Sequence, residues 1–202
     1  MIDTTDDLDG IEIILYIDED DYSYDVINTP CIKVRGPRIV LSEMWNKCFD
    51  KATGDILMHA GDDIIFRTPD WDKTVINTFS EYLDNIVFLF GNDGSPHNGV
   101  FGTHGFIHRK WVETIGYFVP PYFSSDYNDT WLNDVAKVIK RHRHIDILTE
   151  HMHPNFNKGL LDITHQERIA RHSRDNVDQL YLDKLAERLM DAAKLIEVIQ
   201  CA

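Results

Sequence analysis

Residues 56–63 read Ile-Leu-Met-His-Ala-Gly-Asp-Asp, and residues 86–90 read Ile-Val-Phe-Leu-Phe. The first run predicts a strand over residues 56–60, and the second is uniformly apolar, which is typical of a strand covered on both faces. The segment between them carries apolar residues at the steps of an amphipathic helix, namely Trp71, Val75, Ile76, Phe79 and Leu83. A strand, a helix and a second strand predict an α/β fold with a mostly parallel central sheet flanked by helices. Ligands of such a sheet bind at the carboxyl ends of its strands.

The same alternation of elements continues on both sides of this unit. Residues 11–17 predict a strand that ends in the acidic turn 18–21, and residues 31–35 predict a second, shorter strand. Ser42 is expected to cap a helix that closes near Gly54. The remaining elements expected are a strand at 106–108, a helix at 110–115, a helix after Ser124 or Ser125, and a strand at 145–148.

The C-terminal part of the chain predicts one long amphipathic helix over residues 175–200. Its apolar stripe consists of Val177, Leu180, Leu185, Leu189, Ala192, Leu195 or Ile196, and Ile199. We therefore divide the chain into an α/β domain, residues 1–160, and a helical extension, residues 161–202. So short a stripe fits packing on the chain's own core or a seam between two copies, and both alternatives stay open.

Composition limits the classes of function. With 202 residues, of which 43% are hydrophobic, the chain can bury one core. The formal net charge of -14 disfavours a nucleic-acid partner, because an acidic surface repels phosphates. No run of about 20 apolar residues predicts a membrane helix, and no export signal is visible, so a cytoplasmic protein is expected. Cys31, Cys48 and Cys201 are too few and too widely spaced for a disulfide framework or a cysteine zinc site.

Asp62 and Asp63 follow directly on the strand at residues 56–60. Adjacent carboxylates at a strand end can hold a hard divalent cation such as Mg²⁺ or Mn²⁺, while phosphate oxygens fill its other positions. The alternative is an ordinary turn in which aspartate side chains bind the backbone.

His151 and His153 stand two residues apart at the end of the last predicted strand, so in extended geometry both face the same side. Imidazole is a common ligand of transition metals, although such a pair is also compatible with a hydrogen-bonded surface feature. His142 and His144 are expected to be solvated neighbours of Arg141 and Arg143.

Two further groups of charged residues qualify as site residues. Asp126 and Asp129 are spaced so that both face one side of the first turn of a helix, where a carboxylate can act as a general base or merely favour the helix dipole. Lys33, Arg35 and Arg38 form a small basic island that suits a nucleotide's phosphates. The island could equally pair with the acidic residues 18–21. The glycine- and asparagine-rich stretch 91–105 is of the kind used for binding.

Taken in order, several of these segments resemble those of glycosyltransferase family 2-like proteins, which have the GT-A fold. The segments are residues 32–38 (Ile-Lys-Val-Arg-Gly-Pro-Arg), Trp45-Asn46, residues 52–57 (Ala-Thr-Gly-Asp-Ile-Leu), Gly61-Asp62-Asp63, residues 105–109 (Gly-Phe-Ile-His-Arg), residues 115–118 (Ile-Gly-Tyr-Phe), Asn128-Asp129 and residues 151–154 (His-Met-His-Pro). The resemblance covers about residues 11–158 and leaves the C-terminal helix outside it.

The resemblance implies roles for individual residues. Asp62 and Asp63 occupy the family's DXD position with Gly61 in place of the first acid, so Asp63 is the expected ligand of Mn²⁺ or Mg²⁺ and Asp62 the second candidate. Either His151 or His153 supplies a late histidine ligand. Asp129 is the expected catalytic base, and Asp126 is its substitute. The nucleotide-sugar donor is expected to contact Asp18, Lys33, Arg35, Arg38, Asn46 and Asp62.

The resemblance also implies a difference at the N-terminus. Members of the family begin with a strand and a Pro-Thr-Arg turn that form one wall of the nucleobase pocket, whereas only ten largely acidic and polar residues precede Ile11 here. We therefore expect a Rossmann-like fold that is shortened at its N-terminus. Such a chain starts late, is a fragment, or borrows the strand from another chain.

Three hypotheses about function follow. The first is a metal-dependent glycosyltransferase, of the inverting type, that moves a sugar from a nucleotide sugar to a hydroxyl acceptor. The second is a truncated, non-catalytic or partner-dependent assembly protein, which could form a homodimer through its C-terminal helix. The third, based on similarity to phage-encoded members, is an enzyme that glycosylates DNA bases, and the acidic charge argues against it.

Overall fold

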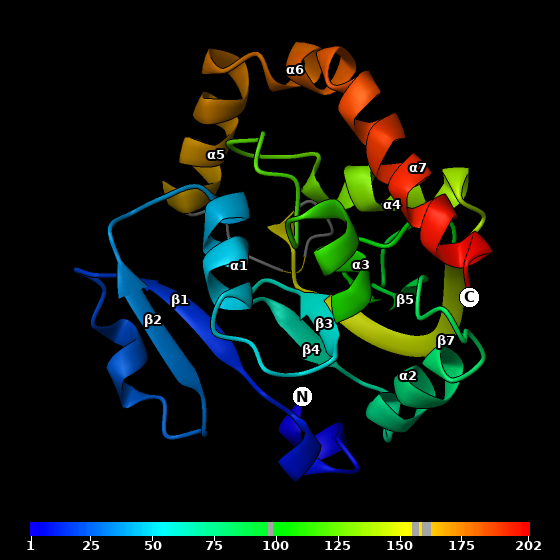
Figure 1. Ribbon diagram of the computed structural model, residues 1–202. Coiled ribbons are helices and arrows are strands. Elements are labelled where there is room, and N and C mark those ends of the chain that lie inside the picture. Colours follow the sequence, from blue (N-terminus) through cyan, green and yellow to red (C-terminus); the bar gives the residue numbers. More distant parts are fainter. Residues whose placement is uncertain (97–98, 155–157, 159–162) are drawn as a thin grey trace.

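A computed structural model describes residues 1–96, 99–154, 158 and 163–202. The fold is α/β, as the sequence predicts. A curled sheet lies between two layers of helices, a smaller sheet lies beside it, and the C-terminal helices arch over one side of the molecule (Figure 1). In the described parts of the chain, no helix is both long and apolar enough to cross a membrane.

The larger sheet is mixed, so the prediction of a mostly parallel sheet is wrong. Within the described residues its five strands run in the order β3 (Ile56–His59), β6 (Gly105–His108), β5 (Phe88–Asn92), β7 (His142–His151) and β4 (Ile64–Phe66). β5 and β7 are parallel, whereas β6 runs antiparallel to both β3 and β5, and β4 runs antiparallel to β7. The carboxyl ends of β3, β5 and β7 therefore still meet at one edge.

The smaller sheet consists of β1 (Ile14–Asp18) and β2 (Ile32–Gly36), which are parallel. Short 3₁₀ turns precede and connect these strands, at Ile2–Thr4, Leu8–Gly10 and Ser23–Val26. Glu12 links this part to the larger sheet, because its carboxylate accepts hydrogen bonds from the backbone and hydroxyl of Thr53. Asp72 similarly accepts from the backbone N–H groups of Asp6 and Asp7 and holds the N-terminal turns in place.

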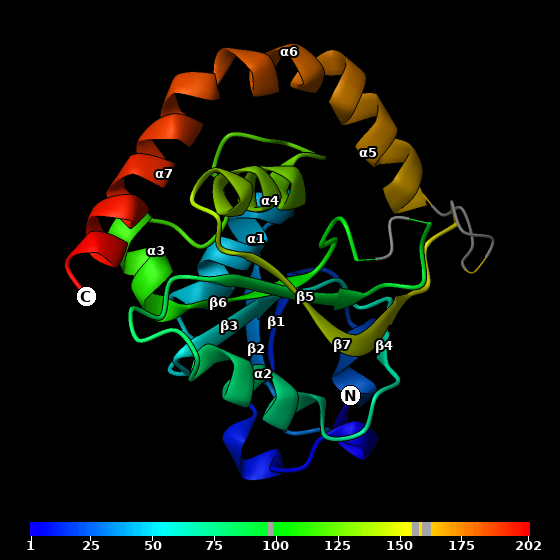
Figure 2. The same ribbon diagram turned by 90° about the vertical axis from the view of Figure 1, so that its right-hand side faces the viewer.

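Helices cover both faces of the larger sheet (Figure 2). α1 (Leu41–Phe49), α3 (Arg109–Ile115) and α4 (Asn128–Val138) lie on one face, and α2 (Trp71–Phe79) lies on the other. The first face packs a core around Phe88, Trp111 and Trp131, all fully buried. The second packs Trp71, Val75 and Phe79 of α2 against Leu89 and Ile147. The other two residues of the predicted stripe are exposed: Ile76 on α2 and Leu83 beyond its end. The apolar run 86–90 is fully buried, as its composition predicts.

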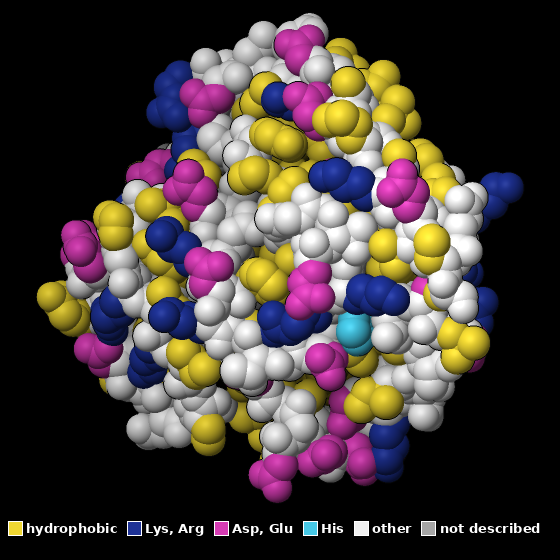
Figure 3. Space-filling view, in the orientation of Figure 1, with side chains coloured by type: hydrophobic (Ala, Val, Ile, Leu, Met, Phe, Trp, Pro, Cys, Tyr) yellow, Lys and Arg dark blue, Asp and Glu magenta, His cyan; other side chains and the backbone are white. Residues whose placement is uncertain are grey.

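The C-terminal part comprises three helices rather than one long helix: α5 (Ile163–Arg174), α6 (Val177–Asp183) and α7 (Leu185–Gln200). The predicted stripe is split because the chain turns at Lys184, between α6 and α7. Val177, Ala192 and Leu195 are buried in the core formed by α3 and α4, so the extension packs on its own chain. Leu185 and Leu189 remain about half exposed, and hydrophobic side chains gather over α6 and the start of α7 (Figure 3).

Several local predictions need correction. α1 begins at Leu41 with Val40 as its N-cap, and the Ser42 hydroxyl instead donates to the carbonyl of Phe123 at 3.0 Å. α1 also ends well before Gly54, at Phe49. β7 begins at His142, which is half-buried against the ring of Phe90 rather than solvated, whereas His144 is exposed as expected.

Candidate functional site

Strand register brings Asp63 and His151 together. The loop after β3 leads at once into β4, a three-residue strand that pairs with the end of β7 so that Ile64 lies opposite His151. The backbone N–H of Met152 donates to the carbonyl of Asp63 at 2.8 Å, which fixes the loop one residue before β4. As a result, Oδ2 of Asp63 lies 3.0 Å from Nε2 of His151. Two residues that the sequence singles out separately therefore share one site.

The two acidic residues of the loop have different environments. Asp63 is half-buried, and the hydrogen bond from His151 lowers its pKa below the usual value, so the carboxylate is charged at neutral pH. Asp62 is exposed, and it accepts a hydrogen bond from the hydroxyl of Tyr24, in the turn between β1 and β2. Trp45 of α1 donates from Nε1 to the carbonyl of Ala60 at 3.0 Å and steadies the start of the loop.

A row of imidazole rings extends from this pair. The ring of His104 lies 4.7 Å from that of His151, His153 lies 5.0 Å beyond His151, and His165 of α5 lies 5.1 Å from His153. Burial, together with the neighbouring His151 and His165, lowers the pKa of His153. His151 thus contacts Asp63, His153 lies next to His151, and the row also contains two histidines that no sequence pattern singles out, His104 and His165.

The donor atoms suit a divalent transition ion, because carboxylate oxygen and neutral imidazole nitrogen are both good ligands for Mn²⁺. As the side chains stand, however, no three His, Cys, Asp or Glu residues in the described part of the chain are arranged to hold a metal. Asp63 and His151 are hydrogen-bonded to each other instead. The remaining positions around an ion would be open to phosphate oxygens of a ligand.

His104 is the least expected member of the row. It precedes β6 at the end of the glycine-rich stretch, it is 6% exposed, and its buried Nε2 atom has no hydrogen-bond partner among the described residues. Burial is the main cause that lowers its pKa to about 3, so the ring is neutral. A buried polar atom without a partner costs about 1–3 kcal/mol, and such atoms are rare enough in folded proteins to call for an explanation.

Asp93 and Asn133 hold the loop that carries His104. The carboxylate of Asp93 accepts hydrogen bonds from the backbone of Ser95 and the hydroxyl of Thr103, and its carbonyl accepts from the backbone of His151 at 2.9 Å. Burial alone would raise the pKa of Asp93, but these hydrogen bonds outweigh it and lower the pKa. The buried Asn133 of α4 donates to and accepts from the backbone of Gly102, both at 2.8 Å. Asp93 and Asn133 therefore fix the two residues that precede His104.

Asp129 lies in the first turn of α4, as predicted, but Asp126 lies before the helix, so the prediction that both share that turn is wrong. The carboxylate of Asp129 accepts hydrogen bonds from the backbone and hydroxyl of Thr130 at 2.7 and 3.3 Å. Burial raises its pKa to about 6, and the nearby charge of Asp126 adds to the rise. A carboxylate whose pKa approaches neutrality is suited to general-base catalysis.

Asp126, the predicted substitute, is already engaged by α5. It forms an ion pair with Arg168 and lies 2.6 Å from Nδ1 of His172. These residues, with Ile169 and Ser173, line a shallow pocket of about 240 Å³ beside Asp126. α5 also reaches the basic island, since Glu167 pairs with Arg38. One helix thus touches the histidine row, the basic island and the segment just before α4, although only packing is expected of the helical extension that contains it.

The predicted nucleotide-contacting residues are mostly engaged within the chain. Lys33 donates to the carbonyls of Tyr24 and Ile27, and Arg35 pairs with Asp25. Arg38 lies 3.7 Å from Asp18 as well as pairing with Glu167, so the alternative pairing with residues 18–21 is partly realised.

Asn46 and Asp18 differ in how far their side chains are engaged within the chain. The side chain of Asn46 is fully used: its amide donates to the carbonyls of Ser42 and Val119 at 2.9 Å and accepts from Phe118 at 2.8 Å, which fixes the segment after α3. Asp18 ends β1 and keeps one carboxylate oxygen buried, with no hydrogen-bond partner in the described part of the chain. Contact with a nucleotide remains a prediction for both residues. Asp18 is the better candidate, because one of its oxygen atoms lacks a hydrogen-bond partner among the described residues, whereas the side chain of Asn46 is fully used.

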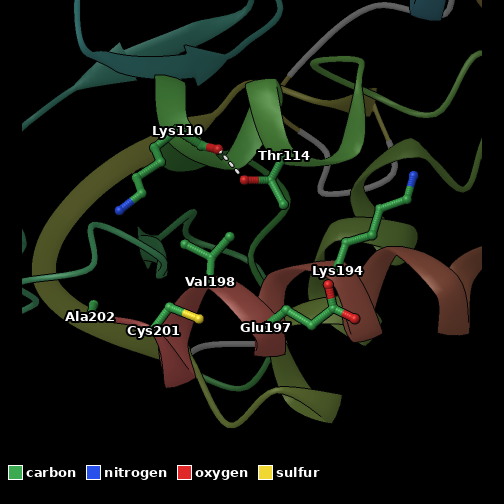
Figure 4. A pocket seen from close by; sticks show the side chains of 7 residues that line it. All are labelled: Lys110, Thr114, Lys194, Glu197, Val198, Cys201 and Ala202. Carbon is green, nitrogen blue, oxygen red and sulfur yellow. Dashed lines mark hydrogen bonds between the residues drawn. The ribbon is translucent and has the colours of Figure 1, made fainter.

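A larger pocket, of about 570 Å³, lies away from all these residues (Figure 4). It opens between α3 and the end of α7, and its lining includes Lys110, Thr114, Lys194 and Glu197. The Thr114 hydroxyl there donates to the carbonyl of Lys110 within α3. Its described lining residues include no carboxylate–imidazole pair of the kind seen at Asp63 and His151.

No model of a known protein family matches the chain, and no curated protein matches it significantly.

Proposed function

We propose that this chain is a metal-dependent glycosyltransferase that moves a sugar from a nucleotide-sugar donor to a hydroxyl acceptor, with inversion at the anomeric carbon. The observation that carries the proposal is the contact between Asp63 and His151, whose donor atoms lie 3.0 Å apart at the carboxyl edge of the larger sheet. This edge is where α/β sheets bind their ligands. The resemblance of the separate segments to one family points to the same residues.

Each residue has a distinct task in this proposal. Asp63 and His151 would hold Mn²⁺ or Mg²⁺, with His153 as the neighbouring candidate, and the ion would neutralise the charge that develops on the leaving diphosphate. Asp129 would accept the proton of the acceptor hydroxyl, whose oxygen bonds to the anomeric carbon as the bond from that carbon to the diphosphate oxygen breaks. The raised pKa of Asp129, about 6, supports this role.

Calorimetry on the full chain tests the proposal. Titration with UDP, GDP and other nucleoside diphosphates, each with and without Mn²⁺, should give binding that requires the metal for at least one nucleotide. Asp129→Asn should retain this binding, because its carboxylate is hydrogen-bonded to Thr130 rather than to the Asp63–His151 pair. If no nucleoside diphosphate binds in the presence of Mn²⁺, the proposal is wrong.

A further inference from the structure

Each ring nitrogen of His172, on α5, faces a carboxylate. Nδ1 lies 2.6 Å from Oδ2 of Asp126, just before α4, and Nε2 lies 3.0 Å from Oδ1 of Asp178 on α6. A neutral imidazole has one N–H group, so it donates to one of these carboxylates and turns a lone pair toward the other. The imidazolium form has two N–H groups and donates to both. The geometry therefore fits the protonated ring.

The groups that face His172 from the neighbouring elements are polar or negative. Tyr127 stacks on the ring, with centroids 6.2 Å apart, and donates from its hydroxyl to Oδ1 of Asp178 at 2.6 Å. This hydrogen bond, followed by the one from His172, lowers the pKa of Asp178, so the carboxylate is charged at neutral pH. The hydroxyl of Ser125 lies 3.3 Å from Nδ1. Two carboxylates therefore stabilise a positive charge on the ring.

The cations of α5 itself contact other atoms. Arg168, one turn before His172, pairs with the second oxygen of Asp126 and shares that carboxylate with the imidazole. Arg171 donates to the carbonyl of Ser124, and Arg174 pairs with Asp175. His172 thus links α5 to both Asp126 and Asp178, whereas Arg168 links it to Asp126.

These contacts matter because none of the residues of α5 is buried. The position of the helix depends on polar contacts, among them the pairs of Arg168 with Asp126 and of Glu167 with Arg38. Guanidinium and carboxylate groups keep their charges around neutral pH, whereas imidazole gains or loses a proton there. The contribution of His172 to holding α5 should therefore change with pH, while the contributions of the two arginines should not.

We propose that His172 is a pH-sensitive clasp: its doubly protonated ring bridges Asp126 and Asp178 and holds α5 against the candidate site, and the helix loosens when the ring loses a proton above neutral pH. Loosening withdraws one cation from Asp126, which lines the pocket of about 240 Å³. It also affects the histidine row, because His165 of α5 lies beside His153. The clasp follows from the contacts of α5, and only its effect on ligand binding rests on the proposed function.

NMR of the full chain reads the protonation of His172 directly, because the ¹⁵N chemical shift of a ring nitrogen changes when its proton is lost. We expect both nitrogens to be protonated at about pH 6 and one at about pH 8. Hydrogen exchange, corrected for the intrinsic dependence of exchange on pH, then measures how firmly α5 is held. Its protection should fall about three- to tenfold between these two pH values, the size expected when two exposed ion pairs are lost.

Two variants at position 172 test the assignment, and circular dichroism establishes that each is folded. His172→Gln removes the charge, so α5 should be weakly protected at both pH values. His172→Arg keeps a positive charge with several N–H donors, so α5 should stay protected at both. His144→Ala is the matched control, because His144 is an exposed histidine on β7, and its fall in protection should equal that of the wild type.

Two results would overturn the clasp. One is a wild-type ring that carries a single proton at about pH 6. The other is a fall in the protection of α5 that is the same in the wild type and in His172→Gln. If His172→Gln does not fold, His172→Arg decides the question, because a fall equal to that of the wild type would contradict the clasp.

The failure of the clasp and that of the proposed function are distinguishable, because neither readout needs a ligand. If no nucleoside diphosphate binds with Mn²⁺, the proposed function is wrong and the clasp stands. If one binds, its association at about pH 8 should be slower with His172→Arg than with the wild type, since the arginine keeps α5 in place. Equal association rates would show that the clasp does not control the site.

Discussion

Arg168 of α5 forms an ion pair with Asp126, which lies just before α4. Further polar contacts hold the same helix, because Glu167 pairs with Arg38 and His172 lies 3.0 Å from Asp178. None of the residues of α5, from 163 to 174, is buried. α5 therefore lies over the candidate site with charged contacts in place of an apolar anchor.

This leads to a prediction about salt. Exposed ion pairs stabilise by about 0.2–1 kcal/mol each and are screened by salt. Hydrogen exchange should show that the amides of α5 are less protected than those of α7 and that 1 M NaCl, roughly a 3 Å screening length, lowers the protection of α5 further. α7 serves as the internal control, because Ala192 and Leu195 anchor it in the core. Equal protection of both helices in high salt would contradict this account.

The environment of Asp129 predicts a stability that depends on pH. Its pKa in the folded chain, about 6, lies above the ordinary value of 3.8, mainly because of burial. The folded state therefore keeps the proton to higher pH than the unfolded state, and the associated stability is present below pH 3.8 and lost as the pH rises through 6. The amide introduced by Asp129→Asn has no proton to lose in this range, so it removes this dependence.

Asp129→Asn should thus gain stability relative to the wild type between about pH 4 and pH 7, by about 3 kcal/mol at one pKa unit per 1.36 kcal/mol. Urea unfolding at both pH values measures the difference. Asp126→Asn is the matched control, and it should instead lose stability at neutral pH, because it breaks the ion pair with Arg168. If the difference in free energy of unfolding between Asp129→Asn and the wild type is the same at both pH values, burial does not raise the pKa of Asp129.

The sequence predicts the elements of this fold better than their pairing. Hydrophobic runs identify β3, β5 and α2 to within a few residues, because burial and periodicity are properties of a local segment. They do not reveal that β6 runs antiparallel between β3 and β5, since the direction of pairing depends on distant partners. β4 spans only Ile64–Phe66, which is too short to show a period.

The same distinction applies to the candidate site. Asp63 and His151 each stand out in the sequence as a possible ligand, but β4 is what sets them against each other, and β4 is the strand that the pattern does not show. His104 follows a glycine-rich loop without any periodic signal, so only its burial and its nitrogen, unpartnered among the described residues, draw attention to it. The break at Lys184 is similarly invisible, because the apolar stripe continues on both sides of it.

The packing of α7 gives a prediction that separates the two roles considered for the C-terminal helices. Leu195 is fully buried against α3 and α4, whereas Leu189 on the same helix is 48% exposed. Leu195→Ala should cost about 2–5 kcal/mol in the free energy of unfolding, because it leaves a cavity. Leu189→Ala should cost less than about 0.5 kcal/mol in a monomer. The alternative is that the exposed face of α7 forms the seam of a dimer. Sedimentation of the wild type and both variants tests it: if the wild type is a dimer and Leu189→Ala is a monomer, the face that carries Leu189 is the seam.

His59 should make the protein sensitive to acid. It is 1% exposed at the end of β3, and burial lowers its pKa to about 4 although the carbonyl groups of Thr103 and Gly105 oppose the shift. Since the folded pKa lies below the ordinary value of 6.5, the associated stability is present above pH 6.5 and lost as the pH falls through 4. His59→Leu should therefore reduce the loss of stability between about pH 7 and pH 4 by about 3 kcal/mol. His144 is exposed, so His144→Ala should leave this loss of stability unchanged. Chemical unfolding of the wild type and both variants at the two pH values measures the losses.

The different environments of Asp62 and Asp63 predict unequal effects of removing their charges. Asp63 contacts His151, whereas Asp62 points to the hydroxyl of Tyr24. A ligand present at about 100 times its dissociation constant stabilises the folded state by about 2.7 kcal/mol, so Mn²⁺ with a nucleoside diphosphate should raise the thermal midpoint of the wild type.

Asp63→Asn should abolish this rise, because an amide is a poor substitute for a charged ligand, and Asp62→Asn should keep most of it. Thermal unfolding with Mn²⁺ alone, with nucleotide alone and with both resolves the contributions, and it requires no knowledge of the acceptor. If Asp62→Asn proves the more damaging change, the ion belongs on the exposed carboxylate beside Tyr24, and His151 serves only to orient Asp63.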